Sequence, residues 1–248
     1  MIKAVAFDIG HTLVHYKNPL NWRSLYEPAL KNVAQICNYQ LTEENYADAI
    51  GILCEYNTRM NPREKEVTAD HIWSRILDSW NKETSDLQRC KDAFYSFFRN
   101  DCYIHGDVVE FLTFLREKNM KTATLSDVAY GLENKYALED ISSIIDYIDL
   151  PYTSNDVGYR KPNVKGLQII AKELGVLIQE VMYIGDEEKD IICANNAGAV
   201  SVLIDREAKG LEYGQQYRVS NLNELKDVLE FCIGRKNSEG IGLPYEFI

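Results

Sequence analysis

The chain has 248 residues, of which 46% are hydrophobic and 26% charged, and its formal net charge is −11 at pH 7. This composition is typical of a soluble globular protein with enough residues for one large domain or two smaller ones. The negative charge argues against nucleic acid or a membrane surface as a partner, because both favour basic patches.

The six cysteines show no C-x-x-C pair and no short spacing. This is typical of reduced, mostly buried residues and predicts neither a zinc site nor a disulfide framework. No apolar run reaches the roughly 18 residues of a membrane span, and Asp8 interrupts the apolar N-terminus. We therefore expect a cytoplasmic protein without a membrane helix. No feature of the sequence indicates an oligomeric state.

The first predicted element is a buried strand over residues 2–7, which are apolar except for Lys3. The run is too short for a helix. It ends at Asp8, and Gly10 and Thr12 follow. In open α/β sheets the ligand crevice lies outside the carboxyl ends of the strands, so Asp8 stands where such a sheet presents a reactive group. An ordinary turn acid is the alternative at this position.

Apolar residues then recur at helical spacing in four segments. The first covers residues 22–37, with Pro28 marking a kink or the true helix start. The second begins after Thr42 and the third after Thr68, both plausible N-caps, and the fourth covers residues 87–98. This pattern predicts a small helical domain inserted after the first strand. Its aromatic residues share the helical spacing, so we expect them to form its core rather than a cofactor site.

From His105 onward, strands and helices are predicted to alternate. Asp107 and Glu110 resemble a capping box that opens a helix. Strands are predicted over residues 121–125, 147–150, 181–184 and 200–204, and further helices over residues 162–174, 191–197 and 222–231, with a weaker helix before residue 147. Repeated strand–helix units predict a parallel sheet with helices on both faces. The glycine-containing tail shows no periodic pattern and predicts no element.

Polar residues stand at the ends of four predicted elements. Asp8, Ser126 and Asp186 each follow a strand, and Lys161 directly precedes a helix. On adjacent parallel strands such groups converge on one crevice. The carboxylates of Asp8 and Asp186 suit Mg²⁺, which prefers oxygen ligands and retains waters. A lysine and a hydroxyl suit the oxygens of a phosphate group. A carboxylate held against a phosphoryl group can attack it and form an aspartyl-phosphate.

Four short motifs carry a resemblance to the haloacid dehalogenase-like hydrolase superfamily. They are FDIGHTL, which resembles the usual D-x-D-x-T of the first motif, LSD, GYRKP, and YIGDEEKDIICANNAG. They occur in the family's order and on the expected elements, and the resemblance spans residues 2–205. It implies an α/β protein whose Rossmann-like parallel sheet core comprises residues 1–15 and 104–248. An all-helical cap of residues 16–103 would be inserted between the first and second motifs.

The resemblance also implies roles for the motif residues. Asp8 would be the nucleophile, and Mg²⁺ would be bound by the Asp8 carboxylate, the Gly10 carbonyl and Asp186. Asp190 would support the metal, either as a direct ligand or through water. Thr12 would brace the loop. The implied activity is a Mg²⁺-dependent phosphatase that acts on a small phosphorylated metabolite.

The remaining implied residues would hold the substrate. Ser126 and Lys161 would bind the transferring phosphoryl oxygens, with Lys161 also counted as catalytic, and Asp127 would belong to the same substrate site. Cationic residues of the cap would read an anionic substrate near these loops; the candidates are Arg23, Arg59, Arg63 and Lys65. The sequence does not indicate which metabolite is bound.

The chain departs from the family pattern at Gly10, where phosphatases of the family usually carry a second aspartate, and His11 replaces a common glycine. The glycine carbonyl can still bind a metal. The missing carboxyl would protonate the leaving group and activate water, a contribution of about 10²–10⁴ in rate. The chain is therefore either a slow phosphatase, one confined to good leaving groups, or a non-catalytic protein that binds phosphate or a partner.

His11 and His15 flank the nucleophile, and either could replace the missing acid because histidine titrates near neutrality. In the alternative, the loop turns His11 away and His15 packs toward the cap. We expect His71 and His105 to be structural.

Two other chemistries of the superfamily are less favoured. Its dehalogenases attack carbon without a metal, and the intact Gly185-Asp186 pair argues against that use. Its phosphonatases carry a small residue at the position of Gly10 and a cap lysine that forms a Schiff base. Lys65 matches that lysine only loosely, and a lone lysine of this kind is usually solvated.

Overall fold

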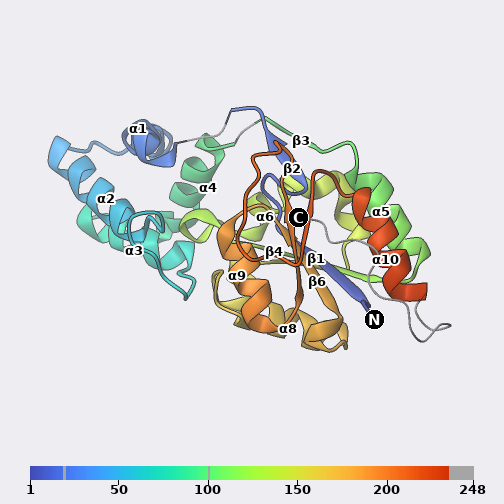
Figure 1. The fold of residues 1–248 in the computed structure, drawn as a ribbon. Helices are drawn as coiled ribbons and strands as arrows, with labels where there is room; N and C mark the ends of the chain where they lie inside the picture. Colours follow the sequence, from blue (N-terminus) through green and yellow to red (C-terminus); the bar gives the residue numbers. More distant parts are fainter. Residues whose placement is uncertain (19–20, 100, 235–248) are drawn as a thin grey trace.

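The computed structural model of the chain describes residues 1–18, 21–99 and 101–234. A sheet covered by helices forms one part of the molecule, and a second group of helices lies to one side of it (Figure 1). The tail beyond residue 234, for which no element was predicted, lies outside the described residues. Among the described helices, none is both long enough and apolar enough to cross a bilayer.

The sheet has six strands in the order β5-β4-β1-β6-β7-β8, and every neighbouring pair is parallel. Its strands are β1 (Ala4–Phe7), β4 (Lys121–Ser126), β5 (Leu150–Thr153), β6 (Val181–Gly185), β7 (Val200–Ile204) and β8 (Tyr217–Val219). In the register of the central strand, Phe7 lies opposite Thr124 of β4 and Ile184 of β6. The carboxyl ends of these three strands therefore lie side by side.

Helices cover both faces of the sheet: α5 (Val108–Glu117) and α10 (Glu224–Gly234) on one, α8 (Lys165–Leu174) and α9 (Glu188–Ala197) on the other (Figure 1). Successive residues of a strand point to opposite faces. Accordingly, Phe7 packs in a hydrophobic cluster with residues of α5 and α10, whereas Ala6 packs with residues of α8 and α9. The predicted α/β class, with a parallel sheet and helices on both faces, is confirmed.

The second group of helices has a hydrophobic core of its own. It comprises a 3-10 turn (Trp22–Leu25), α1 (Tyr26–Cys37), α2 (Glu43–Tyr56), α3 (Ala69–Ser79), a further 3-10 turn (Thr84–Asp86) and α4 (Leu87–Phe97). Aromatic residues at helical spacing, such as Trp73 and Phe94, are fully buried in this core, as predicted. Tyr130, from the segment after β4, also packs in this cluster.

Helix starts in this group follow the predicted caps. The Thr42 hydroxyl accepts a hydrogen bond from the Asn45 N–H, and the Thr68 hydroxyl accepts one from the His71 N–H, both at 3.3 Å. Pro28 lies in the first turn of α1, where an N–H has no partner within the helix. It therefore neither kinks α1 nor starts it.

One predicted cap and one predicted helix start are wrong, although α5 begins after Asp107 as predicted. The Asp107 carboxylate does not cap α5; it accepts hydrogen bonds from Arg206 Nη1 at 3.0 Å and from the Leu222 N–H at 2.6 Å. Partners distant in sequence thus replace the local cap. Pro162 does not open α8, which begins at Lys165, because residues 160–163 form a turn closed by a hydrogen bond from the Asn163 N–H to the Arg160 carbonyl at 2.9 Å.

Other elements differ from prediction in extent or were not predicted. The weaker helix before β5 is a short α6 (Asn134–Ala137) followed by 3-10 turns, and α9 begins earlier than predicted, at Glu188. Three strands were not predicted: β8 at the end of the sheet, and β2 (Val14–Tyr16) and β3 (Cys102–Ile104), which pair antiparallel. The chain leaves for the helical group after β2 and returns through β3.

Candidate active site

The predicted strand-end residues meet at the carboxyl ends of β1, β4 and β6. Asp8 follows β1 directly, and its N–H donates to the Ile184 carbonyl at 2.9 Å, which extends the pairing with β6. Ser126 is the last residue of β4, and Asp186 follows β6. Lys161 reaches the same place from the turn before α8.

Lys161 is the centre of the charged cluster. Its Nζ lies 2.6 Å from Asp8 Oδ1 and 2.6 Å from Asp190 Oδ1, and it donates to the Tyr183 hydroxyl at 3.0 Å. The side chain is only 1% exposed. Burial acts to lower the pKa of Lys161, but the carboxylates of Asp190 and Asp8 outweigh it and hold that pKa well above its usual value. The ammonium group is therefore charged at neutral pH.

Three carboxylates surround this one lysine. Oxygens of Asp8, Asp186 and Asp190 all lie within 4.8 Å of one another. Burial, followed by the charges of Asp8 and Asp190, raises the pKa of Asp186 to about 8. A cluster of hard oxygen ligands with excess negative charge fits a divalent cation such as Mg²⁺.

Asp190 is held by protein groups, which distinguishes it from the other two carboxylates. Its second oxygen accepts from the Glu187 N–H at 2.9 Å. A Cβ at position 185 would lie 2.4 Å from the Asp190 carboxyl carbon, so only glycine lets this side chain approach β6. Asp8 and Asp186 are consequently better placed than Asp190 to bind a cation directly.

The loop after Asp8 has room where the family's second aspartate would stand. The Gly10 carbonyl accepts from the Thr12 N–H at 2.6 Å, which leaves one of its lone pairs free. A Cβ at Gly10 would make only an ordinary contact, 3.6 Å from Tyr16 Cε2. Thr12 is fully buried and donates from its hydroxyl to Asp186 Oδ1 at 3.2 Å, so it links the loop to the carboxylate cluster.

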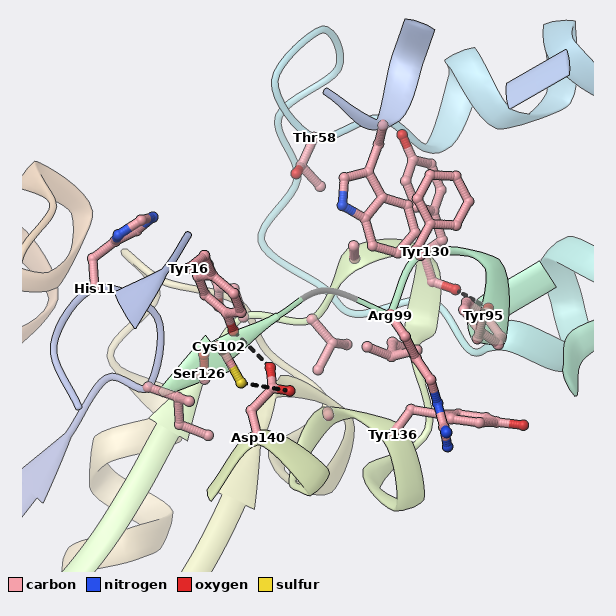
Figure 2. A pocket seen from close by; sticks show the side chains of 18 of the residues that line it. His11, Tyr16, Thr58, Tyr95, Arg99, Cys102, Ser126, Tyr130, Tyr136 and Asp140 are labelled. Carbon is pink, nitrogen blue, oxygen red and sulfur yellow. Dashed lines mark hydrogen bonds between the residues drawn. The ribbon is translucent and has the colours of Figure 1, made fainter. Parts of the chain in front are cut away.

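A cavity of about 970 Å³ lies between the carboxyl ends of the strands and the helical group. Ser126 and His11 line it from the sheet side, and Arg59 lines it from the helical side. Figure 2 shows His11 and Tyr16 on one side of this cavity and Tyr130 and Tyr95 on the other.

The other predicted substrate residue, Asp127, also lines the cavity, but its carboxylate is turned toward protein groups. One oxygen accepts from the Lys161 N–H at 3.0 Å, and the other lies 3.3 Å from Lys189 Nζ. Burial acts to raise the pKa of Asp127, but Lys161 and Lys189 outweigh it and hold that pKa below its usual value. Its side chain therefore ties the β4 loop to the loop that carries Lys161.

The four predicted cationic residues of the cap divide into two groups. Arg23 and Arg59 line the cavity. Arg63 instead donates to the Tyr56 carbonyl at 2.7 Å, and Lys65 forms a β-bridge with Tyr159.

Of the two histidines near Asp8, His11 is exposed to the cavity, with its ring edge-on to Tyr16 at 5.6 Å between centroids. His15 lies in the β2–β3 pair, with its ring 4.9 Å from that of Tyr103. His71 contacts the Tyr56 hydroxyl at 2.9 Å. Burial and, after it, the charge of Arg206 lower the pKa of His105 to about 4.

Sequence reasoning did not single out Tyr183 and Lys189, although both lie within the quoted fourth motif. The buried Tyr183 hydroxyl contacts Lys161 and donates to the Leu125 carbonyl at 2.7 Å. Lys189 lines the cavity and pairs with Glu187 at 2.6 Å. Strand alternation gives a signal for Tyr183, which shares with Val181 the face of β6 that packs against α8 and α9.

Comparison with known proteins identifies the family of this chain. The family described as haloacid dehalogenase-like hydrolase matches residues 7–204. A glyceraldehyde 3-phosphate phosphatase of Methanopyrus kandleri is 28% identical over 243 residues, covering 92% of this chain and 97% of its own. A ribulose-1,5-bisphosphate 5-phosphatase of Halopiger xanaduensis is 26% identical over 213 residues, covering 83% of this chain and 85% of its own.

Among solved structures, a 2-haloacid dehalogenase from Pseudomonas syringae pv. tomato superposes with a TM-score of 0.66 at 17% identity. It covers 94% of this chain and 100% of its own. At that identity the likeness establishes the fold alone. Together with the family match over most of the sequence, it shows that the chain belongs to the haloacid dehalogenase-like hydrolases.

Proposed function

We propose that the protein is a Mg²⁺-dependent phosphatase that acts on a small phosphorylated substrate through Asp8. The observation that carries the proposal is the placement of Lys161 Nζ, 2.6 Å from both Asp8 and Asp190 at the carboxyl ends of the strands. The phosphatase names of the two relatives support it. We further propose that residues 1–15 and 104–248 form the hydrolase core, that residues 16–103 form its cap, and that the protein acts in the cytoplasm.

Asp8, Asp186 and the Gly10 carbonyl would hold Mg²⁺, and Asp190 would support them while it holds Lys161. When bound, the ion neutralises charge on the phosphoryl oxygens. Lys161 and the Ser126 hydroxyl bind those oxygens from the protein side, as charge-assisted and neutral hydrogen-bond donors. The Asp127 carboxylate is bonded to the Lys161 N–H and lies near Lys189, so we assign phosphate binding by Asp127 to its backbone N–H instead.

The chemistry proceeds in two displacements. A carboxylate oxygen of Asp8 attacks phosphorus, the ester P–O bond breaks, and the leaving oxygen takes the electron pair. Water then attacks the phosphorus of the acyl-phosphate, which releases inorganic phosphate and restores the Asp8 carboxylate. Each step needs a proton transfer that a carboxyl at position 10 would supply in other phosphatases of the family.

Gly10 leaves that transfer without its usual group, so the leaving group departs unprotonated unless another residue supplies the proton. Turnover should then depend steeply on leaving-group acidity, and the acyl-phosphate should accumulate. His11 is the candidate replacement, because it lies on the same loop and lines the cavity. His15 is a weaker candidate, because it lies against Tyr103.

Gly10 also favours a second candidate function, that of a non-catalytic protein that binds phosphate or a partner. The discriminating experiment measures Mg²⁺-dependent phosphate release from a panel of aryl, acyl and alkyl phosphates. We expect release from aryl and acyl phosphates, faster than from sugar phosphates. Silence across the panel, with Mg²⁺ binding intact by calorimetry, would favour the binding protein instead.

A further inference from the structure

Among the described residues outside the carboxylate cluster, a densely hydrogen-bonded charged group is Glu66, in the segment that leads into α3. Its side chain is 3% exposed and forms a salt bridge with Arg160, whose side chain is 6% exposed. Its carboxylate also accepts from the Ser154 hydroxyl at 2.5 Å, the Val67 N–H at 2.9 Å and Arg63 Nη2 at 3.3 Å. Four donors from both parts of the molecule thus converge on one buried carboxylate.

Two of these partners fix the loop that follows Ser126. The Ser154 hydroxyl accepts from the Val128 N–H at 3.0 Å, and Arg160 Nη1 donates to the Val128 carbonyl at 2.6 Å. Both backbone polar groups of Val128 are therefore bonded to side chains that Glu66 holds. Val128 lies two positions after Ser126 in the same loop.

The same contact fixes the loop that carries Lys161. Arg160 precedes Lys161, and its N–H donates to the Glu64 carbonyl at 2.8 Å. The Glu66 N–H donates to the Gly158 carbonyl at 3.1 Å. These two backbone hydrogen bonds flank the β-bridge between Lys65 and Tyr159. The Lys161 N–H then bonds to Asp127, which closes a connection between the two loops.

A close backbone approach accompanies this connection. Gly131 has a φ of 66°, and a Cβ there would lie 2.4 Å from both the Val67 carbonyl oxygen and the Ala69 nitrogen. The helical group and the sheet part thus touch here through backbone as well as through the Glu66 side chain. A movement that separated them at this point would break the buried Glu66–Arg160 ion pair and leave Glu66 with Arg63 as its cationic partner.

We propose that Glu66 is a positioning residue that holds the Ser126 loop and the Lys161 loop in one arrangement through Arg160 and Ser154. Buried ion pairs add little net stability because desolvation offsets their attraction, but they can specify one geometry. The functional consequence of this inference rests on the proposed phosphatase activity. The positioning itself does not, and it is testable without turnover.

The first test measures amide hydrogen exchange by NMR in the full chain carrying Glu66→Gln. We expect the Val128 and Lys161 amides to exchange at least about tenfold faster, because the groups that fix them lose their charged anchor. The Ala6 amide in β1 should not change. Glu64→Gln is the matched control: it removes the same charge from the same segment, but the Glu64 side chain is exposed and accepts a hydrogen bond from Asn163 Nδ2 at 2.8 Å.

Unchanged exchange at Val128 and Lys161 would overturn the proposal. If Glu66→Gln does not fold, Glu66→Asp keeps the charge while shortening the side chain. Exchange at Val128 and Lys161 should then also be faster, by a smaller factor. Exchange in Glu66→Asp equal to that of the unmodified protein would overturn the proposal as well.

The second test separates positioning from stability by kinetics on p-nitrophenyl phosphate. Displacing groups that hold the reacting centre by about 1 Å can cost about 10²-fold, so we expect kcat to fall by that order in Glu66→Gln. The Mg²⁺ concentration for half-maximal rate should not change, because Asp8 and Asp186 are untouched. The double variant with Arg160→Gln should be no slower than the slower single variant, because both act through one contact.

A lower melting temperature with unchanged kcat would show a structural role only and would overturn the positioning role. If the unmodified protein releases no phosphate from any ester, the proposed function fails. The exchange experiment then still decides whether Glu66 positions the loops.

Discussion

The carboxylate cluster and the helical wall of the cavity are built in different ways. In the cluster, Lys161 is paired at 2.6 Å with two carboxylates, and burial strengthens each interaction. On the wall, Trp22 stacks on Phe98 at 3.9 Å between ring centroids, and no ion pair to Arg59 is found within the described ranges. On the proposed function, we expect the cluster to determine the reaction and the wall to influence which substrate is bound.

The largest effect should come from removing the nucleophile. Asp8→Asn keeps the side-chain size but cannot form the acyl-phosphate, so we expect phosphate release to fall by at least about 10⁴-fold, as for loss of other catalytic nucleophiles. Asp101→Asn, which removes a charge from the cavity wall, is the matched control and should change the rate little. Equal losses in both variants would erase the distinction between cluster and wall.

Restoring the missing acid should give the next largest effect. Gly10→Asp should raise turnover of alkyl phosphates by about 10²-fold, the lower end of acid–base contributions. The structure allows the change, since a Cβ there meets only Tyr16 at 3.6 Å. Gly10→Ala adds the same Cβ without a carboxyl and should give no gain. A similar gain in both variants would mean that loop stiffening, rather than proton transfer, limits the rate.

The crowded carboxylates predict an unusual pH dependence of stability in metal-free protein. Burial and the charges of Asp8 and Asp190 raise the pKa of Asp186 from 3.8 to about 8. Between these values the folded state binds a proton that the unfolded state has lost, so stability should fall as pH rises, by up to about 1.4 kcal/mol per pH unit.

Urea denaturation in EDTA between about pH 5 and 8 would measure this slope. Asp186→Asn should flatten it, and added Mg²⁺ should raise stability most at the alkaline end, because the ion binds the ionised carboxylates. The same slope in Asp186→Asn as in the unmodified protein would assign it to other groups.

The smallest effect is expected on the cavity wall. Arg59 is exposed, and a solvent-screened charge contributes at most about 1 kcal/mol. Arg59→Ala should therefore raise KM for an anionic substrate by up to about fivefold and leave kcat unchanged. Arg116→Ala, on α5 and outside the cavity, should change neither constant. A fall in kcat for Arg59→Ala would place this residue in the chemistry instead.

Features that depend on neighbouring residues could be predicted from the sequence. Asp8 and Asp186 follow short apolar runs, and the parallel sheet brings strand ends together, so their meeting follows from local pattern and topology. The caps at Thr42 and Thr68 are likewise local. These local features were therefore placed well, whereas the strand predicted over residues 147–150 lies at Leu150–Thr153 and the helix predicted from Pro162 begins at Lys165.

Contacts between distant segments could not be predicted in this way. Asp107 resembled a local cap, but its carboxylate accepts a hydrogen bond from Arg206, which is 99 positions away. The β2–β3 pair joins strands on either side of the whole helical group, so neither shows a hairpin signal. Glu66 lies in an ordinary charged loop by sequence, and its role depends on Arg160, which is 94 positions away.

The central claim, that Asp8 carries the phosphoryl group, is tested most directly by trapping the intermediate. Acid quenching during turnover of an aryl phosphate, followed by borohydride reduction, converts an aspartyl-phosphate to homoserine, which peptide mass spectrometry locates. We expect the modification at Asp8, at higher occupancy in the unmodified protein than in Gly10→Asp, where the added acid speeds hydrolysis. Steady turnover with no modification at Asp8, or with modification at another residue, would contradict the account.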